Sequence, residues 1–280
     1  MSIAFAKYQG LGNDFVVIDN RHRSEPVLGA NGAMQLCDRH FGIGADGVIF
    51  ALPGADGTDC SMRIFNADGS EPEMCGNGIR CLARFLAEST ESQVPSRYRI
   101  GTLAGVMAPQ LRSDGQVTVD MGEPQLLAAE VPTTLCDANE RVIAQPLAVD
   151  GEHWTVTAVG MGNPHCITFV EDADAILLAT LGPQFEHHAA FPQRTNVEFV
   201  RQLRSDRLQA RVWERGAGQT LACGTGACAV VVAGALLGTS DRAATVELPG
   251  GSLHIDWSQH DGRAYMTGPA ERVFVGTYGS

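Results

Sequence analysis

Two cysteines, 148 residues apart, are each followed by the same glycine pattern. Cys75 lies in R-I-F-N-A-D-G-S-E-P-E-M-C-G-N-G-I-R-C, and Cys223 lies in R-V-W-E-R-G-A-G-Q-T-L-A-C-G-T-G-A-C. In both stretches Gly-x-Gly follows the cysteine and leads into a run rich in Ala, Leu or Val, which predicts a helix beginning at the thiol. The unpaired N–H groups and positive dipole at a helix N-terminus favour negative charge and lower a thiol pKa. We therefore expect two ionisable thiols of matched setting.

The repetition extends beyond the cysteines. Gly10-Leu11-Gly12-Asn13 resembles Gly160-Met161-Gly162-Asn163, and Leu103-Ala104-Gly105 resembles Leu248-Pro249-Gly250. Matches in the same order at nearly constant offset indicate a duplicated fold with one cysteine in each half. We predict an N-terminal half over 1–122 plus 269–280, a C-terminal half over 123–268, and an active site in the cleft between them.

One reaction class suits this arrangement. Inverting a stereocentre by proton transfer needs a base on one face of the carbon and an acid on the other. Two thiols from matched halves could supply both, while the helix N-termini would stabilise the charge that collects on a substrate carboxylate when its α-proton leaves. Nothing in the chain suggests a pyridoxal-type lysine site. The predicted chemistry therefore needs no cofactor and no metal.

The motifs closely resemble those of diaminopimelate epimerases across nearly the whole chain. They are G-L-G-N-D-F at 10–15, G-I-G-A-D-G at 42–47, F-N-A-D-G-S at 65–70, C-G-N-G-I-R-C at 75–81, G-N-P-H-C at 162–166, E-R-G-A-G at 214–218, A-C-G-T-G-A-C at 222–228 and L-P-G-G at 248–251. Each is weak alone, but their order and spacing together are specific. The resemblance implies interconversion of LL- and meso-diaminopimelate, in the synthesis of lysine and peptidoglycan precursors.

The resemblance also implies roles for residues of this chain. Cys75 and Cys223 would be the acid–base pair, one thiolate and one thiol at rest, with His165 and Glu214 supporting them. The implied substrate contacts are Asn13, Asn66, Asn163, Asn196, the distal-end pair Glu214 and Arg215, and the amides of Gly76, Asn77, Gly224 and Thr225. It further implies a homodimer with Tyr265 as a contact. Some family members carry glutamine where this chain has Gly47, so no side-chain contact is expected there.

The surrounding elements are predicted from hydrophobic periodicity and turn residues. Strands dominate both halves, and each half contains one long apolar helix, from residue 76 or 77 to 86 and from about 225 to 237. Shorter helices are expected over 33–40 and 173–181, and strands include 98–100, 106–111 and 117–121. The predicted fold class is α/β (α+β): two pseudo-symmetric duplicated domains, each a strand-rich, barrel-like sheet around its central apolar helix.

Bulk properties narrow the function. The 280 residues carry a net charge of −12, which argues against nucleic acid or an anionic membrane as the main partner because both attract clustered Lys and Arg. The N-terminus lacks the features of a secretory signal, and no apolar run approaches the ~20 residues that span a bilayer. We expect a cytoplasmic protein whose eight cysteines are thiols and whose partner is a small molecule.

Three alternatives stay open at this point. A zinc protein could use Cys37, His40, Cys75, Cys81 and the His165-Cys166 pair, although no C-x-x-C pair occurs. A cysteine hydrolase would need only one of the two matched thiols. A related cofactor-independent racemase would keep both cysteines and act on another amino acid. Individually, a cysteine is most often a small buried apolar residue, and an asparagine beside glycine is most often a turn residue.

Overall fold

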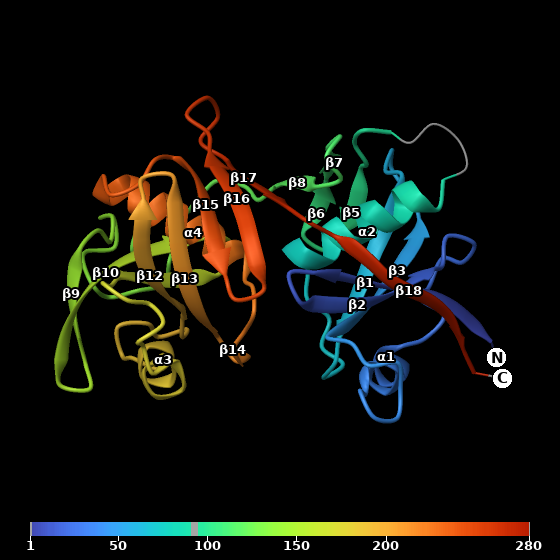
Figure 1. Ribbon diagram of the computed structural model, residues 1–280, viewed down its shortest axis with the longest axis horizontal. Helices are drawn as coiled ribbons and strands as arrows, with labels where there is room; N and C mark the ends of the chain where they lie inside the picture. The colour runs from blue at the N-terminus through green and yellow to red at the C-terminus, as the bar shows by residue number, and fades with distance from the viewer. Residues whose placement is uncertain (1, 91–94, 280) are drawn as a thin grey trace. The chain divides into compact units, whose positions relative to one another are not determined.

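The chain forms two units. The computed structural model describes residues 2–90 and 95–279, and its contacts separate unit 1, Met1–Asp120 with Thr267–Ser280, from unit 2, Met121–Met266. Unit 2 is therefore one continuous segment, whereas unit 1 is built from both ends of the chain. In Figure 1 the red strand β18 accordingly lies with the blue strands of unit 1.

Unit 1 is built mainly from one mixed sheet. Its elements are β1 (Ile3–Gly10), β2 (Asn13–Asp19), α1 (Ala30–Cys37), β3 (Gly47–Pro53), β4 (Cys60–Asn66), α2 (Gly76–Glu88), β5 (Ile100–Thr102), β6 (Gly105–Met107), β7 (Gln110–Leu111), β8 (Val117–Asp120) and β18 (Glu271–Tyr278). The strand order is β18-β1-β2-β3-β4-β5-β6, and β2 runs parallel to β3. Strands β7 and β8 pair with each other in antiparallel fashion.

Unit 2 repeats this plan. Its elements are β9 (Gln145–Val149), β10 (Glu152–Gly160), β11 (Pro164–Phe169), α3 (Leu178–Glu186), β12 (Asn196–Arg204), β13 (Arg207–Glu214), β14 (Gly218–Gln219), α4 (Gly224–Leu237), β15 (Ala243–Leu248), β16 (Gly251–Trp257) and β17 (Ala264–Gly268). The strand order is β17-β16-β15-β13-β12-β11-β10-β9, with β14 beside β13, and β11 runs parallel to β12.

The backbone registers confirm the duplication. Phe15 on β2 pairs with Gly47 on β3, and at the same place in unit 2 His165 on β11 pairs with Asn196 on β12. An antiparallel strand follows in both units, β4 and β13, and the next helix of each unit begins after a cysteine. The predicted fold class, two duplicated strand-rich α+β domains, is thus confirmed.

The two central helices differ in character. Helix α4 is apolar all round, and every residue from Gly226 to Gly234 is buried, as expected of a helix that contacts strands β10, β11, β12, β13, β15 and β16. Helix α2 contacts β1, β2, β3, β4, β7, β8 and β18, but it is not apolar throughout, because it buries Arg80 completely and Asn77 almost completely. The expectation of an apolar helix in each half was therefore wrong for unit 1.

Two shorter helices begin earlier or later than the sequence predicted. The helix expected over 33–40 spans Ala30–Cys37, since the carboxylate of Asp38 accepts the N–H groups of His40 and Phe41 and turns the chain there. The helix expected over 173–181 spans Leu178–Glu186 and contains Pro183. The completely buried Phe185 holds the turn that follows Pro183 in place.

Strand boundaries also departed from expectation in the middle and at the end of the chain. The strand expected over 106–111 is divided into β6 and β7, and Pro109, which has no N–H, lies in the break. The strand expected over 98–100 begins at Ile100 as β5. Strands β9, β14 and β18 were not predicted.

Candidate active site

In unit 1 the thiol of Cys75 caps a helix. Cys75 has extended backbone angles (φ −136°, ψ 117°) and is the N-cap of α2, and its Sγ accepts the backbone N–H of Gly78 at 3.4 Å. The first turn of the helix leaves other backbone N–H groups, including those of Gly76 and Asn77, without intrahelical partners. A negative charge, on the sulfur or on a bound carboxylate, is therefore stabilised at this helix end.

In unit 2 Cys223 occupies the equivalent cap with nearly the same geometry (φ −125°, ψ 115°). Its Sγ lies 3.5 Å from the Thr225 hydroxyl. Burial raises the pKa of Cys223 well above its ordinary value, and the charges of Glu214 and Glu198 raise it further, while hydrogen bonds from Thr225 and Gly226 oppose them. These surroundings favour the thiol form of Cys223 at neutral pH.

Two predicted substrate contacts of unit 1 touch each other. The Asn77 amide donates from Nδ2 to Asn13 Oδ1 at 3.1 Å, and Asn13 Nδ2 donates to Asp46 Oδ2 at 2.7 Å. The loop between β1 and β2 is thereby joined to the first turn of α2, the turn that carries Cys75. Both asparagines are thus held in one orientation beside the candidate acid–base thiol.

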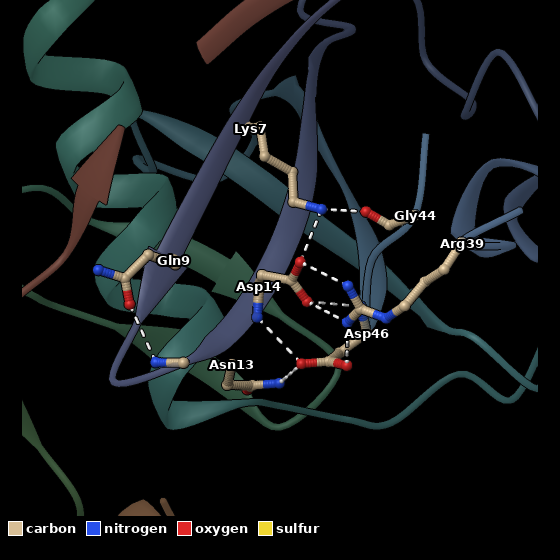
Figure 2. A network of polar contacts seen from close by, with 8 residues as sticks. Lys7, Gln9, Asn13, Asp14, Arg39, Gly44 and Asp46 are labelled. Carbon is tan, nitrogen blue, oxygen red and sulfur yellow. Dashed lines mark hydrogen bonds and ion pairs between the residues drawn. The ribbon is translucent and has the colours of Figure 1, made fainter. Parts of the chain in front are cut away.

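A charged network includes Asp46, whose carboxylate accepts the hydrogen bond from Asn13 (Figure 2). Lys7 Nζ lies 2.7 Å from Asp14 Oδ2, and Arg39 contacts Asp14 Oδ1 at 2.7 Å and Asp46 Oδ1 at 2.9 Å. Burial alone would raise the pKa of Asp14, but the hydrogen bonds from Arg39 and Lys7 lower it to about 2. Asp14 is therefore ionised throughout the neutral range, and the network stays intact.

Arg80 is a residue of this site that the sequence reasoning passed over. It is completely buried in α2 and donates to Gly76 O at 3.1 Å, Asn77 Oδ1 at 3.0 Å and Pro269 O at 3.2 Å. Its guanidinium thus positions the first turn of α2 and ties it to the segment that precedes β18. The available signal was an arginine placed between the apolar residues Ile79 and Cys81 of the predicted helix.

Asn66 ends β4 directly opposite Gly47 on β3. Its Nδ2 donates to the Ser70 hydroxyl at 2.9 Å, which closes the turn after the strand. A Cβ at Gly47 would lie 2.9 Å from the carbonyl oxygen of Phe65, so a larger residue there would require the backbone to move. A glycine at this position is consistent with the expectation that no side chain contributes here.

In unit 2 the predicted residues His165 and Asn163 are in contact. His165 Nε2 lies 2.9 Å from Asn163 Oδ1, and Nδ1 lies 2.7 Å from Oε1 of Glu198. His165 and Glu198 are both completely buried. Burial raises the pKa of Glu198, whereas the neighbouring His165 lowers it, and burial prevails. Glu198 was not predicted, although its place two residues after Asn196 on one strand puts both side chains on the same face.

The distal-end pair lies on the turn between β13 and β14. The backbone N–H of Arg215 donates to Asn196 Oδ1 at 2.9 Å, and its guanidinium donates to Gln193 O at 3.1 Å. Asn196, almost completely buried, also donates from Nδ2 to Pro164 O at 2.7 Å. Glu214 Oε1 accepts the Thr220 hydroxyl at 2.6 Å. Asn196 therefore holds the turn that presents Glu214 and Arg215.

A second unpredicted acid supports the same turn. Glu186, at the end of α3 and almost completely buried, accepts the indole N–H of Trp213 at 2.7 Å and the backbone N–H of Gly216 at 2.9 Å. Gly216 has a φ of 77°, a conformation that glycine adopts without strain. The carboxyl group of Glu186 thus holds both ends of the Glu214-Arg215 segment.

Comparison with known proteins decides the family. The protein-family model described as diaminopimelate epimerase matches residues 5–127 and 157–273 of this chain. The chain is 66% identical over 279 residues to a diaminopimelate epimerase from Gloeothece citriformis and 68% identical over 277 residues to one from Nostoc punctiforme, covering 99% of each relative and 99% of this chain. The chain belongs to the diaminopimelate epimerase family. As its curated relatives are epimerases, it is an isomerase.

Solved structures share the fold at much lower identity. A phenazine biosynthesis protein of the PhzF family from Bacillus anthracis superposes with a TM-score of 0.71 at 16% identity, with both chains fully covered. A hydroxyproline epimerase from Agrobacterium vitis superposes with a TM-score of 0.66 at 15% identity, covering 99% of this chain and 92% of the other. These likenesses extend the two-domain architecture of diaminopimelate epimerases to proteins of other specificity.

Other expectations concern features away from the two helix caps. Tyr265, on β17, donates its hydroxyl to Asp261 at 2.7 Å. Across residues 2–90 and 95–279, no three His, Cys, Asp or Glu side chains are grouped so that they could hold a metal ion, so the zinc site considered from the sequence is not assembled there. Within those same ranges, no helix is long and apolar enough to cross a membrane.

Proposed function

We propose that this chain interconverts LL- and meso-2,6-diaminopimelate by direct proton transfer between Cys75, Cys223 and the substrate α-carbon. One observation carries the proposal: the two cysteines occupy equivalent N-caps in duplicated units, with φ and ψ values that agree within about 11°. Two groups in equivalent settings suit a reaction whose two directions are nearly mirror images. Membership of the diaminopimelate epimerase family supports the choice of substrate.

The proposed reaction conserves protons. A thiolate removes the α-proton from one face and becomes a thiol, while the other thiol gives its proton to the opposite face and becomes a thiolate. The high pKa of Cys223 suits it to be the thiol at rest, so we assign the resting thiolate to Cys75. No cofactor enters either transfer. The product would serve lysine and peptidoglycan precursor synthesis.

The carboxylate beside the reacting carbon is proposed to lie at the helix N-termini. The backbone N–H groups of Gly76 and Asn77 in α2, and of Gly224 and Thr225 in α4, would stabilise the charge that spreads onto this group when the α-proton leaves. Asn13 and Asn163, which follow the duplicated glycine turns, would hold its amino and carboxylate groups, and Asn66 would add a further polar contact. Their amides are polar without carrying charge, which suits a zwitterionic substrate.

The distal amino acid centre of diaminopimelate is proposed to bind Glu214 and Arg215. A carboxylate and a guanidinium side by side complement an ammonium and a carboxylate, and the planar guanidinium can grip a carboxylate through two hydrogen bonds. Asn196 would act through the backbone of Arg215. A racemase for a smaller amino acid would not need this charged pair, which favours diaminopimelate over that alternative.

The decisive experiment follows the α-proton of LL-diaminopimelate by proton NMR in D2O, with dithiothreitol and EDTA present and no pyridoxal phosphate added. We expect loss of the α-proton signal together with formation of the meso isomer. Folded, reduced protein that exchanges no proton of diaminopimelate but exchanges that of another amino acid would overturn the choice of substrate. Activity that requires added metal or pyridoxal phosphate would overturn the two-thiol chemistry.

We also propose that the protein is a homodimer with Tyr265 at the contact. The proposal rests on the family resemblance and on the partly exposed position of this aromatic side chain on β17. Light scattering coupled to size-exclusion chromatography should give about twice the 29.8 kDa chain mass, and Tyr265→Ala should shift the distribution towards the monomer. A wild-type protein that elutes as a monomer at micromolar concentration would contradict this.

A further inference from the structure

The two units differ at one matched pair of strands. In unit 1 the parallel strands β2 and β3 bring Phe15 opposite Gly47, and in unit 2 the parallel strands β11 and β12 bring His165 opposite Asn196. The residue two positions along the second strand faces the same way, and it is Ile49 in unit 1 but Glu198 in unit 2. Unit 1 thus has an aromatic and an aliphatic side chain where unit 2 has an imidazole and a carboxyl group.

Both second-strand residues lie under the first turn of the central helix. A Cβ built on Gly78 would lie 3.1 Å from Ile49 Cδ1, and one built on Gly226 would lie 2.7 Å from Glu198 Oε1. The second of these positions is also 3.3 Å from Cys223 Sγ. Glu198 is therefore a neighbour of the helix turn that carries the catalytic thiol proposed for unit 2.

Packing does not explain the polar pair. Burying an acid and a histidine costs free energy unless their hydrogen bonds are made. Glu198 Oε1 contacts His165, but Oε2 has no hydrogen-bond partner in the part of the chain that the structure describes. In unit 1 the apolar residues Phe15 and Ile49 fill the corresponding place without that cost. Packing therefore does not require the acid and the histidine of unit 2, and we infer that they have another role.

The contacts of His165 indicate what that role is. Its Nε2 faces Asn163 Oδ1 at 2.9 Å, and an amide oxygen can only accept, so Nε2 carries a proton. Its Nδ1 shares a second proton with Glu198 Oε1 at 2.7 Å. Whichever of the two holds that proton, Nε2 keeps its own. With its oxygen turned towards the imidazole, the half-buried Asn163 turns its NH2 group the other way.

We propose that Glu198 is a positioning residue, which acts through His165 to fix the Asn163 amide so that its NH2 group faces the substrate. This inference rests on the proposed function, in which Asn163 binds substrate. Without Glu198 the imidazole can take the other neutral tautomer, and Asn163 must then turn its NH2 group to the bare Nε2 and its oxygen to the substrate. A negatively polarised oxygen would then face a carboxylate.

The first test separates positioning from stability by installing the unit 1 pair in unit 2. Glu198→Ile alone leaves His165 buried without its partner and should lower Tm markedly, whereas replacing both members of a buried polar pair by apolar residues is often neutral. The double variant Glu198→Ile with His165→Phe should therefore recover most of the Tm but keep a kcat/KM about 10- to 100-fold below wild type, mainly through KM. A double variant with wild-type kcat/KM would overturn the proposal.

A conservative pair of variants tests the same point without large repacking. The amide of Glu198→Gln can donate to Nδ1 and so preserve the proton on Nε2, and kcat/KM should stay within about fivefold of wild type. Glu198→Met has a similar shape but no donor, and it should lose at least ~10-fold. Glu247→Gln, at a surface ion pair with Arg207, is the matched control and should leave activity unchanged. Equal losses in the Gln and Met variants would overturn the proposal.

The tautomer can be measured without any turnover. In protein labelled with 15N-histidine, the His165 resonances, assigned by their absence in His165→Phe, should show a protonated Nε2 in wild type and in Glu198→Gln, and a changed tautomer in Glu198→Met. An unprotonated Nε2 in wild type would overturn the positioning role even in an active epimerase. Conversely, the expected tautomer in a protein that does not epimerise diaminopimelate would contradict only the proposed function.

Discussion

At the scale of single residues, the two thiols have similar backbones and different surroundings. Cys75 accepts a backbone N–H at the end of a helix whose first turn is held by the guanidinium of Arg80. Cys223 is buried near the carboxyl groups of Glu198 and Glu214. The duplicated fold thus gives its two thiols different surroundings, and those of Cys223 raise its pKa.

Removing either thiol should abolish epimerisation. Because general acid–base groups contribute about 10²- to 10⁴-fold, Cys75→Ala and Cys223→Ala should each lower kcat at least ~1000-fold while the circular dichroism spectrum is unchanged. Cys136→Ala, which alters a partly buried thiol outside both helix caps, is the control. Near-normal turnover in either of the first two variants would rule out the two-base assignment and favour a single nucleophile.

The raised pKa of Cys223 should be visible in its reactivity. Since only the thiolate is alkylated, iodoacetamide should modify Cys223 slowly at pH 7.5 and faster as pH rises, as followed by mass spectrometry of the peptides. Glu214→Gln removes a neighbouring negative charge, so the same rate should be reached at lower pH. Glu247→Gln should leave the profile unmoved. A Cys223 rate that does not change with pH would contradict the assignment of a resting thiol.

At the scale of elements, each helix turn is fitted to the side chain beneath it. Gly78 and Gly226 are equivalent first-turn glycines, one above the end of an isoleucine and the other above a buried carboxyl oxygen. A methyl group above Ile49 can be accommodated by a small shift of a flexible apolar side chain. The same methyl group above Glu198 must displace a carboxyl group from its hydrogen bond with His165.

Equivalent alanine substitutions should therefore have unequal effects. Gly78→Ala should change the free energy of unfolding by no more than about 1 kcal/mol, because the tight contact offsets the better helix propensity of alanine. Gly226→Ala should cost about 2 kcal/mol more, since it disturbs a buried polar pair. Urea titrations of the two variants give the comparison. Equal losses would show that Glu198 moves aside freely.

The sequence predicted the elements best where the pattern was local. The buried strands β2, β3, β11 and β12 and helix α4 follow from apolar runs, and both caps follow from Cys-Gly-x-Gly. Elements that depend on distant contacts were missed: β18 is stabilised by pairing with β1, and the last turn of α3 by the buried Phe185. The residues of β18 alone do not reveal that this strand pairs with β1, about 270 positions earlier in the chain.

The residues of the candidate site also divide into those that a local sequence pattern predicts and those that it does not. Residues that belong to duplicated or family-like motifs, such as Cys75, Asn13 and Asn163, could be named from the sequence. The residues that hold them could not, because Glu198, Glu186 and Asp46 act through contacts that exist only after folding. A buried acid looks in sequence like any acid on a strand or helix.

At the scale of the whole molecule, buried thiols make stability depend on alkaline pH. Burial raises the pKa of Cys37 to about 11 and the pKa values of Cys60 and Cys81 to about 12. In the unfolded chain a thiol ionises near pH 8.5. Since the folded pKa values lie above the unfolded value, their contribution is fully present below about pH 8.5 and is lost as pH rises towards 11 to 12.

Urea unfolding between pH 7.5 and 10, with a reducing agent present, should therefore show a falling free energy of unfolding. Each of these thiols should contribute a loss of about 1–2 kcal/mol by pH 10. Cys60→Ala should start from a lower free energy, because it leaves a cavity, but fall less steeply with pH. A slope in this variant equal to that of wild type would mean that Cys60 ionises as readily folded as unfolded.

The pairing of β1 with β18 has a consequence for synthesis on the ribosome. Ile3 is translated well before Tyr278, yet the two residues lie opposite each other in one antiparallel ladder. Unit 2 lies between them and is made as one piece, so it can be complete while β1 still has an open edge. An open strand edge invites pairing with other chains. The pairing of β1 is thus completed only after unit 2 and β18 have been translated, although β1 itself is made before both.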